Sequence, residues 1–232
     1  VLFGTPKPID TTANIGVMEK DNVNIVVHGH DPSLSEMVVY YANDPEMIAY
    51  AKSMGAKGIT VSGVCCTSNE VAMRHGIPMA GNFLNQENVV LTGACEAIVV
   101  DVQCIFPALG PLSKCFHTKF ITTSPIARMP DSEFIQFNAE TAGENAKAIV
   151  KMAIENFKNR NPELVNIPDQ KQNARVGYSV EAIVKVLDGV ANSQVDEFGT
   201  TKPLLECITS GVLRGAVAMV GCNNPKVRPD SA

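Results

Sequence analysis

The chain has 232 residues, of which 45% are hydrophobic, and 19 Lys and Arg stand against 24 Asp and Glu for a formal net charge of -5. This apolar content is enough for the core of one large α/β domain, or of one domain plus part of a second, and it argues against a disordered chain. The basic residues are too thinly spread to neutralise a phosphate backbone, so we expect no nucleic-acid partner.

The apolar runs indicate where the protein is located in the cell, and the two ends of the sequence indicate whether it is a fragment. No run is long enough to cross a bilayer, and the opening VLFGTPKPID lacks the regions of a signal peptide, so we expect a cytoplasmic protein without a membrane span. The sequence opens at Val1 without a methionine and stops at Ala232, soon after the apolar run 216–220. A sheet protein would normally continue there, which predicts a fragment.

Short runs rich in Val and Ile alternate with segments of helical periodicity, the pattern of a parallel sheet covered by helices. We expect strands at 23–27, 58–64, 97–103, 119–123 and 134–137. We expect helices at 33–41, 45–54, 67–75, 86–94 and 106–114. Right-handed crossovers between these strands predict an α/β fold, a Rossmann-like parallel sheet with flanking helices.

A second unit is expected after the longest helix, 139–159, which closes a first domain of residues 1–160. The polar, proline-containing segment 161–174 is interpreted as a connector. Residues 175–232 then form the truncated start of a second Rossmann-like α/β domain. Its expected elements are a helix at 180–187 with Ser179 as N-cap, a helix at 201–209 and a buried strand at 215–221.

Soft metal ligands follow the strong predicted strands. Seven cysteines, an odd number without an export signal, argue against a disulfide framework. The residues that follow expected strands are His28 and His30, Cys65 and Cys66, Cys104, and Cys222. Open parallel sheets build their sites at the carboxyl ends of strands, because the loops converge there. Thiolates with an imidazole suit zinc or iron–sulfur chemistry, and the long gaps favour a cluster held by several loops over a compact zinc knuckle.

The remaining cysteines and histidines have simpler interpretations. A single cysteine is more often a small buried hydrophobe than a ligand, and none of Cys95, Cys115 and Cys207 follows an expected strand, so we interpret them as packing residues. For His28, a capping or turn position is the simpler alternative to a ligand role, His75 is assigned to a helix end and His117 to a turn. The glycine-rich stretches match neither a dinucleotide-binding fingerprint nor a P-loop, so nucleotides are not indicated.

Four stretches of the sequence, in this order, resemble the signature segments of a known family. They are VHGHDPSLSE at 27–36, GVCCTSNEVAMRHGIP at 63–78, VDVQCIFP at 100–107 and GCNNP at 221–225. The chain is similar, over essentially its whole length, to the central portion of the catalytic subunits of anaerobic nickel–iron–sulfur carbon monoxide dehydrogenases.

The resemblance implies an oxidoreductase that interconverts CO and water with CO₂, two protons and two electrons at a nickel–iron–sulfur cluster of the Ni–4Fe–4S type. It implies that His30 and Cys66 bind an outlying iron of that cluster. Cys104 and Cys222 would each bind an iron of the core, and Cys65 is placed in the wall of the site.

The family also has two further cysteines after the GCNNP motif, one of which binds nickel, and an acid–base lysine. Neither feature has a counterpart in this sequence. We therefore expect the cluster of the isolated chain to be incomplete or absent, the chain alone to be inactive, and none of its residues to be catalytic. For the complete protein, the resemblance implies a homodimer and, in some members, an acetyl-CoA synthase partner.

Two alternatives stand beside this interpretation. One is a hybrid-cluster-type iron–sulfur protein, against which the paired VHGH and GVCCT motifs argue. The other is a non-catalytic α/β module whose cysteines are structural, either buried in packing or bound to one zinc ion.

Overall fold

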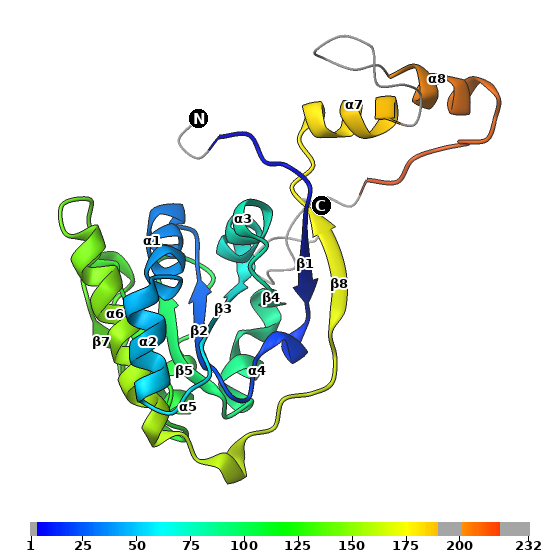
Figure 1. Cartoon of the computed structure of the whole chain (residues 1–232). Helices are drawn as coiled ribbons and strands as arrows, with labels where there is room; N and C mark the ends of the chain where they lie inside the picture. Colours follow the sequence, from blue (N-terminus) through cyan, green and yellow to red (C-terminus); the bar gives the residue numbers. More distant parts are fainter. Residues whose placement is uncertain (1–3, 190–200, 219–232) are drawn as a thin grey trace.

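A computed structural model of the chain describes residues 4–189 and 201–218. The described strands form one eight-stranded sheet in the order β7-β6-β5-β2-β3-β4-β1-β8 (Figure 1). They are β1 (Ile9–Ala13), β2 (Val23–His28), β3 (Ile59–Val64), β4 (Met79–Gly81), β5 (Cys95–Val100), β6 (Lys119–Thr122), β7 (Glu133–Phe134) and β8 (Gln172–Val176). All neighbouring pairs are parallel except β1 and β8. The expected α/β class and Rossmann-like parallel sheet with flanking helices are confirmed.

The helices cover both faces of this sheet. They are α1 (Pro32–Ala42), α2 (Pro45–Ser53), α3 (Cys65–His75), α4 (Gln86–Leu91), α5 (Leu109–Lys114), α6 (Ala142–Asn156), α7 (Val180–Gly189) and α8 (Lys202–Thr209). One buried apolar cluster joins the sheet to α1, α2 and α6, and a second joins the opposite face to α4 and α5. Every helix in the described ranges is too short or too polar to cross a lipid bilayer.

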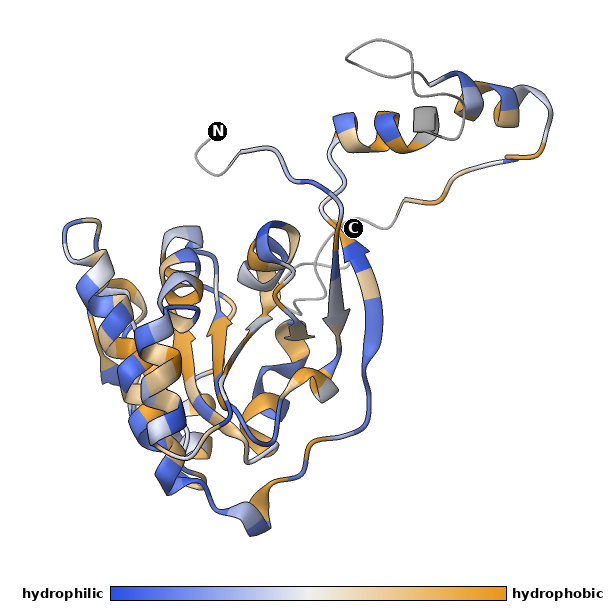
Figure 2. Cartoon of the chain, viewed as in Figure 1, coloured by the Kyte–Doolittle hydropathy of each residue, from blue (hydrophilic) through white to orange (hydrophobic). Residues whose placement is uncertain are grey.

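Alternation along the central strands explains this two-sided core. On β2, Val23, Ile25 and Val27 belong to the first cluster, whereas Val26 belongs to the second. Because successive side chains of a strand point to opposite faces, a strand that is buried at every position, as β2 is, must be covered on both sides. The apolar central strands between more polar helices are visible in Figure 2.

Several expected elements differ from the observed ones. Cys95, which lies just beyond the helix expected at 86–94, is the first residue of β5, because α4 ends at Leu91 and Gly93 turns the chain with a φ of 64°. The expected strand at 134–137 is reduced to the short strand β7. Residues 215–218 of the expected strand at 215–221 are irregular and exposed, and residues 219–221 lie outside the described residues.

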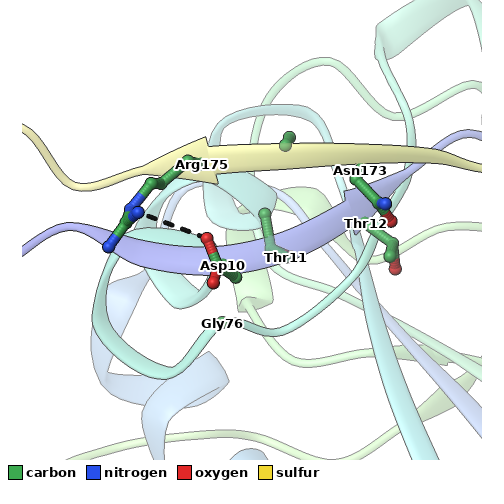
Figure 3. Close-up of a pocket in the computed structure, with 7 residues that line it drawn as sticks. Asp10, Thr11, Thr12, Gly76, Asn173 and Arg175 are labelled. Carbon is green, nitrogen blue, oxygen red and sulfur yellow. Dashed lines mark ion pairs between the residues drawn. The ribbon is translucent and has the colours of Figure 1, made fainter.

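The strand β8 is an element that periodicity did not predict. It begins within the segment expected as a connector and pairs antiparallel with β1, placing Arg175 opposite Asp10 with their side chains 3.6 Å apart (Figure 3). Its sequence, QNARV, is mostly polar, so no apolar alternation marks it.

The division into domains stays a prediction. The N-cap assignment is confirmed, since the Ala182 amide donates to Ser179 Oγ at 3.1 Å.

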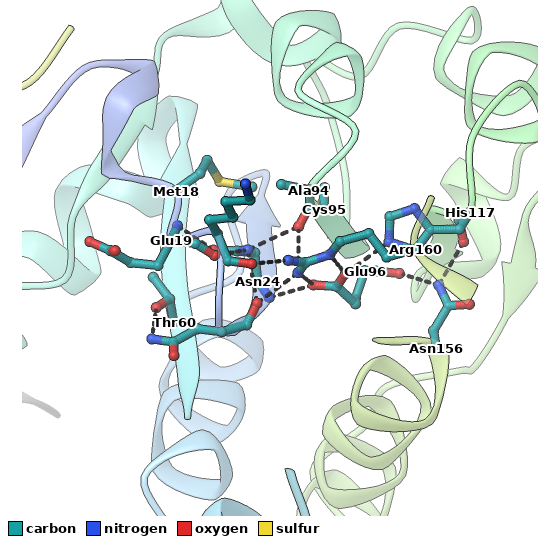
Figure 4. Close-up of polar contacts among 12 residues, drawn as sticks. Met18, Glu19, Asn24, Thr60, Ala94, Cys95, Glu96, His117, Asn156 and Arg160 are labelled. Carbon is teal, nitrogen blue, oxygen red and sulfur yellow. Dashed lines mark hydrogen bonds and ion pairs between the residues drawn. The ribbon is translucent and has the colours of Figure 1, made fainter. Parts of the chain in front are cut away.

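A buried ion pair holds the amino-terminal ends of the central strands. Glu96, fully buried on β5, accepts two hydrogen bonds of 2.7 Å from Arg160, which follows the last turn after α6 (Figure 4). The same carboxylate accepts from the Asn24 amide at 2.6 Å and lies 2.8 Å from His117 Nε2. This network ties β2, β5 and the segment after α6 together at the edge of the sheet opposite the strand ends that carry the candidate ligands.

The Glu96–Arg160 pair gives a stability prediction. We expect Arg160→Ala to lower the free energy of unfolding by about 3–5 kcal/mol, because it leaves a buried carboxylate without its charged partner. Denaturant unfolding followed by circular dichroism measures this loss. Lys57→Ala, which removes the partner of exposed Asp21, is the control and should leave stability nearly unchanged. Equal effects of the two substitutions would contradict the assigned role.

Candidate metal centre

Three potential ligands meet at the carboxyl edge of the sheet. The strands β5, β2 and β3 are neighbours, so the segments that follow them converge. His30 lies just after β2, Cys65 directly follows β3 as the first residue of α3, and Cys104 lies in the loop after β5. One nitrogen or sulfur ligand atom from each of these residues lies within 4.8 Å of the others. This group of one imidazole and two thiols, found among the described residues, offers the nitrogen and sulfur donors that soft metals prefer.

The imidazole of His30 is oriented by its neighbours. Its Nδ1 lies 2.9 Å from the carbonyl oxygen of Val102, and its Nε2 lies 4.0 Å from Cys104 Sγ. A carbonyl oxygen can only accept, so Nδ1 donates to it, and the neutral tautomer with this proton leaves the lone pair of Nε2 on the side of the thiol. This is the arrangement in which a histidine can act as a metal ligand.

The backbone around the cysteines adopts an unfavourable conformation. Cys65, Gln103 and Cys104 have φ values of 67°, 60° and 53°, in the left-handed region that residues with a Cβ rarely occupy. Backbone strain of this kind persists only where surrounding contacts hold the residue in place, and such residues cluster at functional sites. Here it places two thiols of different loops beside one imidazole.

The loop that carries Cys104 is also supported from the protein interior by two buried polar side chains, those of His28 and Gln86. His28, the last residue of β2, lies with its Nε2 3.0 Å from Gln86 Oε1. The Gln86 carboxamide in turn donates to the carbonyl oxygen of Cys104 at 2.9 Å. Burial lowers the pKa of His28, so the ring is neutral and its Nε2–H donates to the carboxamide. His28 is therefore a buried support for the loop that carries Cys104, and the alternative of a turn position for His28 is wrong because the residue ends β2.

The thiol of Cys65 is held in its neutral form by its surroundings. Burial, followed by the proximity of Cys66 and Cys104, raises the pKa of Cys65 to about 12. A bound cation would reverse this effect, because it compensates the charge of several thiolates in one place. The three donors therefore fit a soft metal, either iron within a sulfur cluster or zinc.

The structure places the four predicted ligands differently. His30 and Cys104 lie in the group of three. Cys66 is exposed, follows Cys65, and lines with it a cavity of about 550 Å³ that is otherwise bordered mainly by asparagine and apolar side chains. Cys222 lies outside the described residues. The ligand roles of all four stay predictions.

Cys65, expected only in the wall of the site, is the thiol that the structure groups with His30 and Cys104. The adjacent pair of cysteines signalled the position, but adjacent residues at the start of a helix point in different directions. The sequence could not decide which thiol faces the imidazole.

Three further cysteines, Cys95, Cys115 and Cys207, and the histidines His75 and His117 do not belong to this group. Cys95 is fully buried in β5, which confirms packing, but Cys115 and Cys207 are exposed, so their assignment to packing was wrong. His75 ends α3 as expected and lies 2.6 Å from a Glu36 carboxylate oxygen.

A separate cavity of about 720 Å³ lies along β1 and β8 (Figure 3). Its lining includes Asp10, Thr12, Asn173 and Arg175 and contains no histidine or cysteine. The cysteine-lined edge is therefore the better candidate for a metal site.

A parallel sheet whose neighbouring strands bring an imidazole and thiols together defines an α/β protein with a candidate soft-metal centre. The model of the Prismane/CO dehydrogenase family matches residues 1–232, and the chain belongs to this family.

Relatives and solved structures agree with the family match. The chain is 54% identical to carbon monoxide dehydrogenase 1 of Methanosarcina mazei over 228 residues, which are 98% of the chain and 35% of the relative. A nickel-free crystal structure of carbon monoxide dehydrogenase from Thermococcus sp. AM4 matches with a TM-score of 0.88 and 52% identity, over 97% of this chain and 34% of that one.

A third match is a structure of an acetyl-CoA synthase/carbon monoxide dehydrogenase with NiZn[Fe4S4] and NiNi[Fe4S4] clusters in closed and open alpha subunits. It matches with a TM-score of 0.86 and 43% identity, over 97% of this chain and 32% of that one. The chain thus spans about a third of the length of the proteins it matches.

The site makes a prediction about the fold of the chain itself. Cys66→Ala and Cys104→Ala should each change the free energy of unfolding by no more than about 1 kcal/mol, because both thiols are at least partly exposed. Denaturant unfolding of the metal-free chain measures this, with Cys95→Ala in the core as the control that should cost more. Unfolding of the metal-free Cys66→Ala or Cys104→Ala chain would contradict this prediction and show that the thiol itself supports the fold.

Proposed function

We propose that this chain is part of an anaerobic carbon monoxide dehydrogenase, an oxidoreductase that converts CO and water into CO₂, two protons and two electrons, and the reverse. The observation that carries the proposal is the convergence of His30, Cys65 and Cys104 at one edge of the sheet, in a chain whose relatives are named carbon monoxide dehydrogenases. The cofactor proposed for the complete protein is a nickel–iron–sulfur cluster of the Ni–4Fe–4S type.

The proposed roles are those that the family resemblance implies. His30 and Cys66 bind an outlying iron, and Cys104 and Cys222 each bind an iron of the sulfur core. Cys65, beside His30 and Cys104, contributes a further thiol to the wall of the site. When bound, the cluster supplies a Lewis acid that activates water and an acceptor for the two electrons released from CO.

The residues of this chain contribute orientation and shielding. The Val102 carbonyl fixes the His30 proton on Nδ1, which leaves Nε2 as the ligand atom. Gln86 fixes the Cys104 loop from the interior, and the buried ends of β2 and β3 exclude water from beneath the site. None of these residues has to donate or accept a proton during turnover.

The isolated chain is proposed to be inactive. The resemblance places the nickel-binding cysteine beyond the GCNNP motif, and a site that lacks part of its ligand set does not assemble a complete cluster. The complete protein is proposed to act in the cytoplasm as a homodimer on CO, CO₂ and water, with acetyl-CoA synthase as a partner in organisms that have one.

The activity test uses the complete protein that carries this chain. Cys66→Ala and Cys104→Ala should each reduce CO oxidation, measured with a viologen electron acceptor, to background. Iron and nickel content should fall in parallel, because each thiol is a cluster ligand. Cys115→Ala removes an exposed thiol at the end of α5 and should retain wild-type activity.

Near-normal turnover in Cys66→Ala or Cys104→Ala would contradict the ligand assignment. Metal analysis after anaerobic purification separates the remaining interpretations. Stoichiometric zinc without iron in the complete protein would exclude a nickel–iron–sulfur cluster and favour a non-catalytic module with one structural zinc.

A further inference from the structure

We propose that Asp101 is a positioning residue for the metal centre. Its carboxylate clamps the loops that follow β2 and β5, so that the imidazole of His30 faces the thiol of Cys104. The inference rests on the proposed function, because it concerns the ligands of that same centre. It assigns to Asp101 the control of the geometry and the protonated nitrogen of His30.

The contacts of Asp101 link the two loops directly. The residue is buried immediately after β5, and its carboxylate accepts the His30 amide at 2.7 Å through Oδ1 and at 2.9 Å through Oδ2. Oδ2 also accepts the Asp31 amide at 2.7 Å, and Oδ1 accepts the amide of Val102. One charged group thus holds three backbone N–H groups from two loops, and hydrogen bonds to a charged acceptor are stronger than neutral ones.

The close approach requires a glycine. Gly29 has a φ of 141°, and a Cβ at this position would overlap the Asp101 carboxylate. Gly29 lies between the buried His28 and the ligand candidate His30. A side chain at residue 29 would therefore force the carboxylate and the His30 loop apart.

The backbone of Val102 connects the Asp101 carboxylate to the imidazole of His30. Its N–H is bound by the Asp101 carboxylate, and the carbonyl oxygen of Val102 accepts from His30 Nδ1 at 2.9 Å. Asp101 therefore holds both the backbone of His30 and the residue whose carbonyl orients its ring. Groups that orient a ligating histidine in this way typically change metal affinity by roughly 10- to 100-fold when they are removed.

The test measures two properties of the chain under anaerobic conditions. The first is the affinity for added Co²⁺, read from the absorption of cobalt–thiolate bonds. The second is the tautomer of His30 without metal, read from the ¹⁵N chemical shifts of labelled histidine, with His30→Gln used to assign the resonances. A purely structural role of Asp101 would alter stability without moving the tautomer.

Asp101→Asn keeps the shape of the side chain but replaces one acceptor oxygen by a donor that faces backbone N–H groups. We expect Co²⁺ affinity to fall by roughly 10- to 100-fold and the His30 proton to redistribute between the two ring nitrogens. The matched control is Asp44→Asn, which alters a carboxylate that accepts the Glu46 amide at 2.8 Å at the start of α2. It should change neither property.

Gly29→Ala tests the clamp without altering the carboxylate and should give the same two changes, so the proposal stays testable if Asp101→Asn fails to fold. Wild-type Co²⁺ affinity in either folded variant, or lost affinity with an unchanged His30 tautomer, overturns the proposal. Failure of the unaltered chain to bind Co²⁺ overturns it as well. CO oxidation by the complete protein is measured separately, so the proposed function and the role of Asp101 can fail independently.

Discussion

The parallel pairing of β5, β2 and β3 is the constraint on which the candidate site depends. Each of these strands has a hydrogen-bonded neighbour on both sides, and the described parts of the core pack against both of their faces. Their directions and order bring the segments after His28, Val64 and Val100 to one edge. Residues that are far apart along the sequence become neighbours there, without any local motif of closely spaced ligands.

The amino-terminal and carboxyl edges of this sheet differ in their polar groups and in their backbone conformation. At the amino-terminal edge, the Glu96–Arg160 pair satisfies buried charge with charge, and its contacts fix the strand starts. At the carboxyl edge, Cys65 and Cys104 have strained backbones, and their thiols lie near each other and near the His30 imidazole. The ion-paired amino-terminal edge thus supports a carboxyl edge with a strained backbone, as expected where a fold carries a metal centre.

The sequence predicted the central strands and the positions after them because apolar runs and strand ends are local signals. It could not predict β8, whose polar residues are ordered by pairing with β1 rather than by burial. Nor could it place Cys95, since an apolar run near a helix end is compatible with either a helix or a strand. The choice between Cys65 and Cys66 depends on the helix start, and the role of Asp101 depends on contacts between loops that no periodicity encodes.

The central claim is that one imidazole and thiols from separate strand ends bind the same metal. X-ray absorption at the cobalt edge of the Co²⁺-loaded chain tests it most directly, because the nearest shell distinguishes sulfur from lighter atoms. Our account predicts a mixed shell of sulfur and nitrogen that loses nitrogen in His30→Gln and loses sulfur in Cys104→Ala. A shell of oxygen and nitrogen alone, or one unchanged by both substitutions, would contradict it.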